Sequence, residues 1–342
     1  MKTATRQLKR RDFLKGTTLA ALALGATGRH ELRADAESKP AGSQPTSRDG
    51  QDAQRGPSIQ VGILLGTFGR DTLEARLDAA KHYGLDCVQV SMDHAGLSDM
   101  PEAIPAEVAG RIRREAKARG IAIAAAQGTF NMSHPDAEYR RKGLKRLRVL
   151  AEACAEMGTS KIHICTGTRD RENMWRRHPD NDSPAAWKDM IACVREATDF
   201  ARQAHVTLAF EPEVNNVVDS ARKARRLMDE IGSPFLKVTI DGANIFHAGE
   251  LPRMKEVLDE AFELVGKDIV LAHAKDLDHD GDAGHLPAGK GKLDYDHYLG
   301  LLYRYRFRGP LLLHGLSEAQ VPECVGFLRD KLARLVSSAQ QK

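Results

Sequence analysis

Eight short apolar runs, each followed by a segment of helical periodicity, constrain the fold of this chain more than any other feature. The runs are rich in β-branched residues and are separated by glycine turns such as Gly84, Gly120 and Gly158. They cover residues 59–65, 87–92, 121–127, 161–166, 206–211, 236–241, 269–275 and 310–315. Strands that alternate with helices form parallel sheets, because each crossover helix returns the chain to the same edge. Eight such units predict an α/β protein with one closed (β/α)₈ TIM barrel.

The alternative arrangement is an open, doubly wound sheet. Such sheets usually bind a nucleotide at a glycine-rich turn between the first strand and its helix. Here that turn reads GTFG at 66–69 and lacks the G-x-G-x-x-G spacing, so the closed barrel is favoured. Helices are predicted at 72–83, 106–119, 137–157, 185–204 and 321–335.

The N-terminal segment lies outside this alternating pattern. Residues 1–36 hold the pair Arg10-Arg11, a short apolar run and a small-x-small end, a combination that resembles a twin-arginine signal peptide. The apolar run is shorter than the ~20 residues that a membrane-spanning helix needs. Residues 37–57 are polar and are predicted to be a flexible linker before a barrel at 58–338. We therefore expect an exported, periplasmic or extracytoplasmic protein without a stable membrane anchor; an uncleaved anchor or a basic tail is the alternative.

Charge and cysteine spacing argue against two further classes of protein. Beyond residue 36 the chain carries 43 basic and 44 acidic side chains, so its body gives no electrostatic reason to expect nucleic acid. The five cysteines form no C-x-x-C pair, and each falls inside a predicted strand or helix. We predict buried free thiols rather than disulfides or a zinc knuckle.

Three consecutive predicted strands end in residues that bind metals. The fifth ends in Glu211, the sixth in Asp241, and His273 comes near the end of the seventh. Catalytic groups of such barrels sit at these strand ends, and adjacent strands lie ~4.8 Å apart, so the three side chains can converge on one ion. Carboxylate and imidazole donors suit Mn²⁺, Zn²⁺, Co²⁺ or, less well, Mg²⁺. The pattern predicts one divalent metal ion, although a strand-end acid can also simply cap a helix.

The sequence around these residues resembles the xylose isomerase-like TIM barrel superfamily, which includes sugar phosphate isomerases and epimerases. The similarity rests on the runs FEPEVNN (210–216), TIDGANIF (239–246) and AHAKD (272–276), and it covers roughly residues 59–335. It implies that Glu211, Asp241 and His273 are metal ligands. It further implies that Asn244 contacts substrate or metal-bound water, and we assign Lys275, which follows the histidine, to substrate binding.

His314 departs from the pattern of this superfamily. The eighth strand normally ends in a glutamate that is both the fourth ligand and a catalytic base, and epimerases of the tagatose type use it opposite the first glutamate. Imidazole can bind a metal but cannot act as that second carboxylate. We predict His314 as a ligand, Glu211 as ligand and catalytic residue, and Glu213 as the second catalytic carboxylate, with Glu318 as its alternative.

Residues of the connecting loops complete the predicted site. His134 follows the third strand and is predicted to bind substrate. The long loop at 168–184 is predicted to act as a lid whose Trp175 or an arginine contacts a sugar ring. His163, in the middle of the fourth strand, is interpreted as an interior histidine with its hydrogen bonds satisfied.

The resemblance implies a divalent-metal-dependent isomerase or epimerase that acts on a small sugar or keto-sugar through an enediolate. The alternative is a lyase or dehydratase of 3-keto-glycosides or inososes, favoured by the missing glutamate and by export, since an exported enzyme meets glycosides. A phosphodiesterase like endonuclease IV would need a D-x-H after strand seven, which is absent. A non-catalytic sugar-binding barrel is a further alternative. Barrels of this type often form homo-oligomers, which is a possible state here.

Overall fold

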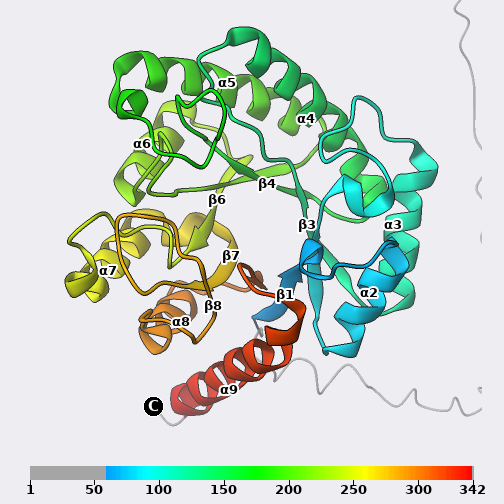
Figure 1. Cartoon of the computed structure of the whole chain (residues 1–342), viewed down its shortest axis with the longest axis vertical. Coiled ribbons are helices and arrows are strands. Elements are labelled where there is room, and N and C mark those ends of the chain that lie inside the picture. The colour runs from blue at the N-terminus through cyan, green and yellow to red at the C-terminus, as the bar shows by residue number, and fades with distance from the viewer. Residues whose placement is uncertain (1–58, 341–342) are drawn as a thin grey trace, which may run out of the picture. The chain divides into compact units, whose positions relative to one another are not determined.

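Eight parallel strands close into a barrel in the computed structural model, which describes residues 59–340 (Figure 1). The predicted signal peptide and linker lie outside these residues. The strands of the barrel are β1 (Gln60–Leu64), β2 (Cys87–Val90), β3 (Ala122–Gln127), β4 (Lys161–Cys165), β5 (Thr207–Glu211), β6 (Leu236–Asp241), β7 (Ile269–Asp276) and β9 (Pro310–Leu313). Each pairs with the next in parallel, and β9 pairs with both β7 and β1, which closes the sheet. The predicted TIM barrel is confirmed.

Helices surround the strands (Figure 1). They are α2 (Leu73–His82), α3 (Ala106–Ala118), α4 (Ala137–Met157), α5 (Pro184–Gln203), α6 (Ala221–Ile231), α7 (Met254–Val265), α8 (Tyr295–Arg304) and α9 (Val321–Gln340). Several begin directly after a residue whose side chain accepts a backbone N–H of the first turn, as Thr72, Ser183 and Ser220 do. None of the helices within 59–340 combines the length and the apolar character needed to cross a membrane.

Alternation along the strands separates two environments. In β4, Ile162 and Ile164 pack into the large core under the helices, whereas His163 and Cys165 occupy the alternate positions. Small residues pack against each other inside the barrel, as Ala125 and Ala209 do with Leu271. The described cysteines, at 87, 154, 165, 193 and 324, are all buried and free, as predicted.

Strand register brings the carboxyl ends of the middle strands to one level. Glu211 is the register partner of Cys165, and Asp241 is the register partner of His273. Leu313 pairs with Ala274, and the backbone N–H of His314 donates to the carbonyl of Ala274. The eighth barrel strand therefore ends one residue before His314, but this residue still lies at the rim beside β7.

A short strand outside the barrel forms a hairpin at the same rim. β8 (Leu286–Pro287) pairs antiparallel with the end of β7, with Lys275 opposite Pro287 and Asp276 opposite Leu286. The Asp276 carboxylate accepts the backbone N–H groups of Leu277, Gly289 and Leu293. Asp276, the residue after Lys275, therefore holds the turn at 289–293 in place.

We expect Gly143→Ala to destabilise the protein, because a Cβ at this buried position of α4 would lie 2.2 Å from the ring of Phe130. Gly300→Ala in α8 is the matched control, since a Cβ there meets nothing within 4 Å. Both variants gain helix propensity, so their difference isolates overpacking, which typically costs about 1–3 kcal/mol. Urea unfolding of the two variants measures that difference. Equal free energies of unfolding would contradict the packing around Phe130.

Candidate functional site

Three of the four predicted metal ligands meet at the rim of the barrel. Asp241 of β6, His273 of β7 and His314 after β9 each offer a ligand atom within 4.8 Å of the others. The imidazole rings of His273 and His314 have centroids 5.3 Å apart. Asp241 is fully buried and His273 nearly so. The sequence placed these groups on neighbouring strands, and the structure brings them together.

Glu211, the fourth predicted ligand, adjoins this cluster. Its Oε2 lies 3.5 Å from Nδ1 of His273 and 3.4 Å from Nε2 of His163. Asn244 donates from Nδ2 to Oε1 of Glu211 over 2.6 Å. Burial alone would raise the pKa of Glu211, but the neighbouring His273, with His163 and Lys275, lowers it below its usual value. This lowered pKa favours the ionised carboxylate, which lies beside the three clustered side chains.

The donor atoms of the cluster fit a divalent cation. Oδ2 of Asp241, both ring nitrogens of His273 and Nδ1 of His314 are buried without a hydrogen-bond partner among the described residues. Leaving such groups unpaired is costly, and burial raises the pKa of Asp241 for the same reason. Burial holds the pKa of His314 well below its usual value, which leaves a neutral imidazole able to bind a metal. An ion held by Asp241, His273 and His314, with Glu211 in reach, would satisfy these atoms.

A cavity of about 370 Å³ opens above these residues, within the usual size of small-molecule sites. The predicted residues that line it are Glu211, Glu213, Asn244, His273, Lys275 and His314. Nζ of Lys275 lies 3.6 Å from Oδ2 of Asp241, so this buried ammonium partly balances the buried carboxylates. One small polar molecule in the cavity could therefore contact carboxyl groups, the Asn244 amide and the Lys275 ammonium together.

Glu213 faces this cavity although it is only 2% exposed. Its carboxylate accepts the backbone N–H of Asn215 over 3.0 Å and a hydrogen bond from Nδ2 of Asn216. Burial, together with the charge of Glu211, raises the pKa of Glu213 to about 7. A carboxyl group with such a pKa can both accept and donate a proton near neutral pH. Glu318, the alternative, pairs instead with Arg70 and Tyr83.

Comparison with known proteins places the chain in a family. A sequence profile described as xylose isomerase-like TIM barrel matches residues 77–331, more than half of the chain. The chain belongs to this family. The family assignment agrees with the closed barrel and with the resemblance of the three strand-end runs.

Relatives of this xylose isomerase-like barrel include sugar epimerases and a dehydratase. An L-ribulose-5-phosphate 3-epimerase of Salmonella paratyphi A is 22% identical over 270 residues, which is 76% of this chain and 89% of the relative. The 3-keto-D-glucoside 4-epimerase YcjR of E. coli superposes with a TM-score of 0.62 at 18% identity, over 82% of this chain and 99% of that one. The probable 3-DHS dehydratase AsbF of Bacillus anthracis has a TM-score of 0.62 at 15% identity, over 79% and 98%. The structural likenesses establish a shared fold.

His163 is a buried, hydrogen-bonded histidine, as interpreted from the sequence, but its place in the cavity was missed. It lines the cavity of this xylose isomerase-like barrel, and its Nδ1 lies 3.1 Å from the hydroxyl of Thr239. Burial, with a contribution from His273, lowers its pKa to about 3, so the imidazole is neutral. His163, Cys165 and Glu211 also offer ligand atoms within 4.8 Å of one another. His163 and Cys165 alternate with Ile162 and Ile164, which pack under the helices, and this alternation was the signal that the histidine and the cysteine point into the barrel.

Other lining residues come from loops and from β3. Trp175, from the long loop at 168–184, lines the cavity, and the lid function of this loop stays a prediction. Three arginines of that loop are engaged elsewhere: Arg169 pairs with Asp189, Arg176 with Asp170 and Arg177 with Asp182. Gln127 at the end of β3 and Asp282 in a loop also line the cavity, and no sequence motif marked them. Asn215 lines it too; it lies in the FEPEVNN run, but no role was predicted for it.

His134 occupies a different environment from the one expected of a substrate-binding residue. Its Nε2 lies 3.2 Å from the carbonyl oxygen of Arg171, and its Nδ1 accepts the backbone N–H of Asp136 over 3.1 Å. Its ring stacks on Tyr139 with centroids 4.1 Å apart. The ring thus fixes its own loop, and His134 is not among the described residues that line the cavity. A role in substrate binding stays a prediction.

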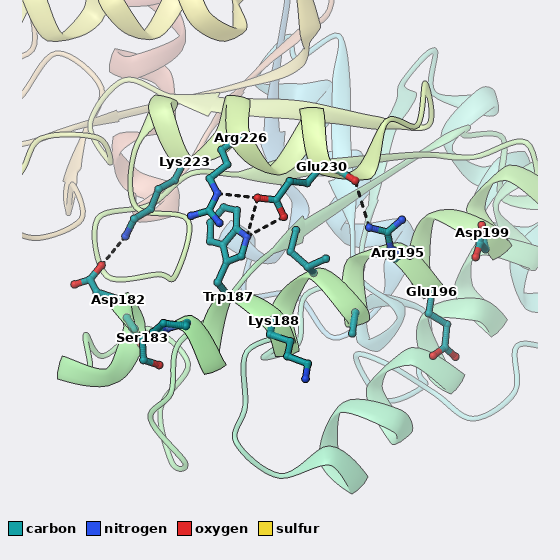
Figure 2. Close-up of a pocket in the computed structure, with 14 residues that line it drawn as sticks. Asp182, Ser183, Trp187, Lys188, Arg195, Glu196, Asp199, Lys223, Arg226 and Glu230 are labelled. Atoms are coloured by element: carbon teal, nitrogen blue, oxygen red, sulfur yellow. Dashed lines mark hydrogen bonds and ion pairs between the residues drawn. The ribbon is translucent and has the colours of Figure 1, made fainter.

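A larger hollow, of about 800 Å³, lies between α5 and α6, away from the strand ends (Figure 2). Four of its charged groups pair with one another. Trp187 donates from Nε1 to both oxygens of Glu230, and Arg226 pairs with Glu230 while stacking 4.0 Å above the tryptophan ring. Lys223 pairs with Asp182. Asp182, Lys223, Arg226 and Glu230 are thus engaged with one another, unlike the unpartnered atoms at the barrel rim.

Proposed function

We propose that this xylose isomerase-like barrel is a divalent-metal-dependent isomerase or epimerase of a sugar or keto-sugar. The observation that carries the proposal is the set of buried, unpartnered donor atoms of Asp241, His273 and His314 below a cavity that also holds Glu211 and Glu213. The names of its relatives, which act on a ribulose phosphate and on a 3-keto-glucoside, support a carbohydrate substrate.

The residues of the cavity divide the chemistry between them. Asp241, His273 and His314 would hold a divalent ion such as Mn²⁺, Zn²⁺, Co²⁺ or Mg²⁺, which would supply Lewis acidity toward a substrate carbonyl. Glu211, ionised and close to the ligand cluster, removes the proton from the carbon beside the carbonyl. Glu213, with a pKa of about 7, holds or returns a proton. Asn244 and Lys275 donate hydrogen bonds to substrate oxygens, and the ring of Trp175 covers the sugar.

Exchange of substrate hydrogen with solvent tests this proposal. In D₂O, the wild-type protein with metal should incorporate deuterium at the carbon beside the carbonyl of its keto-sugar. Removal of metal with a chelator should slow the exchange by ~10³-fold or more, because Lewis-acid stabilisation is worth several kcal/mol and each 1.36 kcal/mol is tenfold. NMR of a panel of free ketoses and 3-keto-glucosides measures the incorporation. Absence of exchange with every member of the panel would count against an isomerase or epimerase.

A lyase or dehydratase acting on 3-keto-glycosides or inososes is the second candidate. It is favoured by His314, which stands where a second glutamate would face Glu211, because elimination needs only one base on one face of the substrate. The shared fold of the dehydratase AsbF is compatible with it. Release of an aglycone or of an unsaturated product in the same NMR assay distinguishes elimination from proton return.

The proposal also covers where the protein works. The Arg10-Arg11 pair with its apolar run supports export by the twin-arginine route to the periplasm or another extracytoplasmic compartment. Fractionation of cells that make the full chain and its Arg10→Lys/Arg11→Lys variant tests this, since retention of the variant in the cytoplasm is expected. Gel filtration of the exported form tests for a homo-oligomer.

A further inference from the structure

A second cluster of metal-binding side chains lies on the hairpin between β7 and β8. Asp278, His279 and His285 each offer a ligand atom within 4.8 Å of the others, and all three are exposed. None of them belongs to the barrel cluster formed by Asp241, His273 and His314.

The hairpin itself creates this juxtaposition. Asp276 pairs with Leu286 in antiparallel register, so the residues just after Asp276 lie opposite His285. Nδ1 of His279 lies 2.5 Å from Oδ1 of Asp278, and Nε2 of His285 lies 3.6 Å from the same oxygen. The two imidazole rings have centroids 5.1 Å apart. Two imidazoles from opposite arms of a hairpin thus flank one carboxylate.

Two other acids of the hairpin, Asp280 and Asp282, accept hydrogen bonds from neighbouring segments of the chain. Asp280 accepts the backbone N–H of Leu251 over 2.7 Å. Asp282 accepts hydrogen bonds from Nδ2 of Asn215 and from the backbone N–H of Ala283. Asp278, by contrast, directs its carboxylate to the two histidines, and its hydrogen bond to His279 holds its pKa below the usual value.

We infer that Asp278, His279 and His285 form a second divalent-metal site, distinct from the one in the barrel. Two imidazoles and one carboxylate suit Zn²⁺ and similar transition-metal ions, with water completing a tetrahedral set. The exposure of all three side chains allows the ion to bind and leave without opening the barrel.

An ion at this site would fix one wall of the cavity. Asp282 and Ala283, at the tip of the same hairpin, line the cavity above the barrel cluster. The tip is tied to the site by the bond between Asp282 and Asn215 over 2.6 Å, and by the backbone N–H of Gly284, which donates to Oδ1 of Asn244 over 2.9 Å. Joining the two arms of the hairpin through a metal restrains this wall, so the site acts as a structural clamp on the cavity.

Counting bound Zn²⁺ tests the inference. Untagged full-length protein is stripped with a chelator, equilibrated with micromolar ZnCl₂ alone, separated by gel filtration and analysed for metal. Wild type should hold two equivalents, and His279→Asn/His285→Asn should hold one. Asp241→Asn should retain the equivalent of the hairpin. His82→Asn, an exposed histidine on α2 outside any such cluster, is the matched control and should hold two.

A second measurement locates the ion. In the Asp241→Asn background, adding Zn²⁺ should slow amide hydrogen exchange in residues 277–285, and the additional His279→Asn/His285→Asn change should remove this protection. A double-histidine variant that binds as much Zn²⁺ as wild type would overturn the inference. If wild type holds a single equivalent that only Asp241→Asn removes, the hairpin site is likewise refuted while the barrel site stands. A single equivalent lost only in the double-histidine variant would establish the hairpin site and refute the barrel site.

Discussion

Asp241→Asn is expected to lose the metal ion of the barrel and, with it, ~10³-fold or more of the turnover, since Lewis-acid catalysis contributes several kcal/mol. The side chain is fully buried, its Oδ2 has no hydrogen-bond partner among the described residues, and it belongs to the three-ligand cluster. Asparagine has nearly the same shape but no charge. Metal analysis and solvent deuterium exchange are measured on the same preparation, in the His279→Asn/His285→Asn background so that only the barrel site is counted.

The fold of this variant should survive. Oδ1 of Asp241 accepts the backbone N–H of Ala243 over 3.0 Å, and the amide oxygen of asparagine can accept the same bond. Metal-free wild type and metal-free variant should therefore unfold at similar urea concentrations. A folded variant that keeps its metal and its exchange rate would show that Asp241 is not a ligand, and the proposed chemistry would fail with it.

Glu213→Gln is expected to lower the rate of substrate exchange by ~10²–10⁴-fold, the usual contribution of a general acid or base, while the metal stays bound. Glu213 lines the cavity but lies outside the ligand cluster, so its loss removes a proton carrier and no ligand. This separates it from Asp241→Asn, in which metal and activity should disappear together. Single-turnover exchange with metal analysis measures both quantities.

Glutamine at position 213 removes the ionisable group but keeps the shape of the side chain. Its amide oxygen can still accept the backbone N–H of Asn215, so the loop after β5 keeps that contact. An unchanged rate of substrate exchange in Glu213→Gln would show that Glu213 only holds this loop and carries no proton. Glu211, beside His273, would then be the only acid predicted to move protons.

His314 changes the charge of the site as well as its geometry. Glu211 is ionised and Asp241 carries the second carboxyl group, whereas His163 and His314 are held neutral by burial. Two carboxylates balance a divalent ion, and the Lys275 ammonium, 3.6 Å from Asp241, adds one positive charge. The site can therefore hold one metal without excess negative charge while presenting one carboxylate, Glu211, next to it. This balance suits a reaction that uses one base.

The sequence by itself determined the barrel and the ends of its strands. Runs such as VTLAFE and LKVTID carry bulky apolar residues at alternate positions, which pack under the helices. Parallel strands end at the same rim, so Glu211, Asp241 and His273 could be placed together without knowing any long-range contact. Comparing the alternation in β4 with that in β5 would also have placed the His163 side chain inside the barrel, in the cavity.

Only the tertiary structure decided what the loop residues do. His134 is held by the carbonyl of Arg171, and Glu318 is held by Arg70 and Tyr83, partners that lie far away in the sequence. The hairpin of β7 and β8 is likewise invisible in the sequence, because a two-residue strand carries no periodicity. The regular backbone of a strand fixes the direction of its side chains. The directions of loop side chains depend on contacts that exist only after the chain has folded.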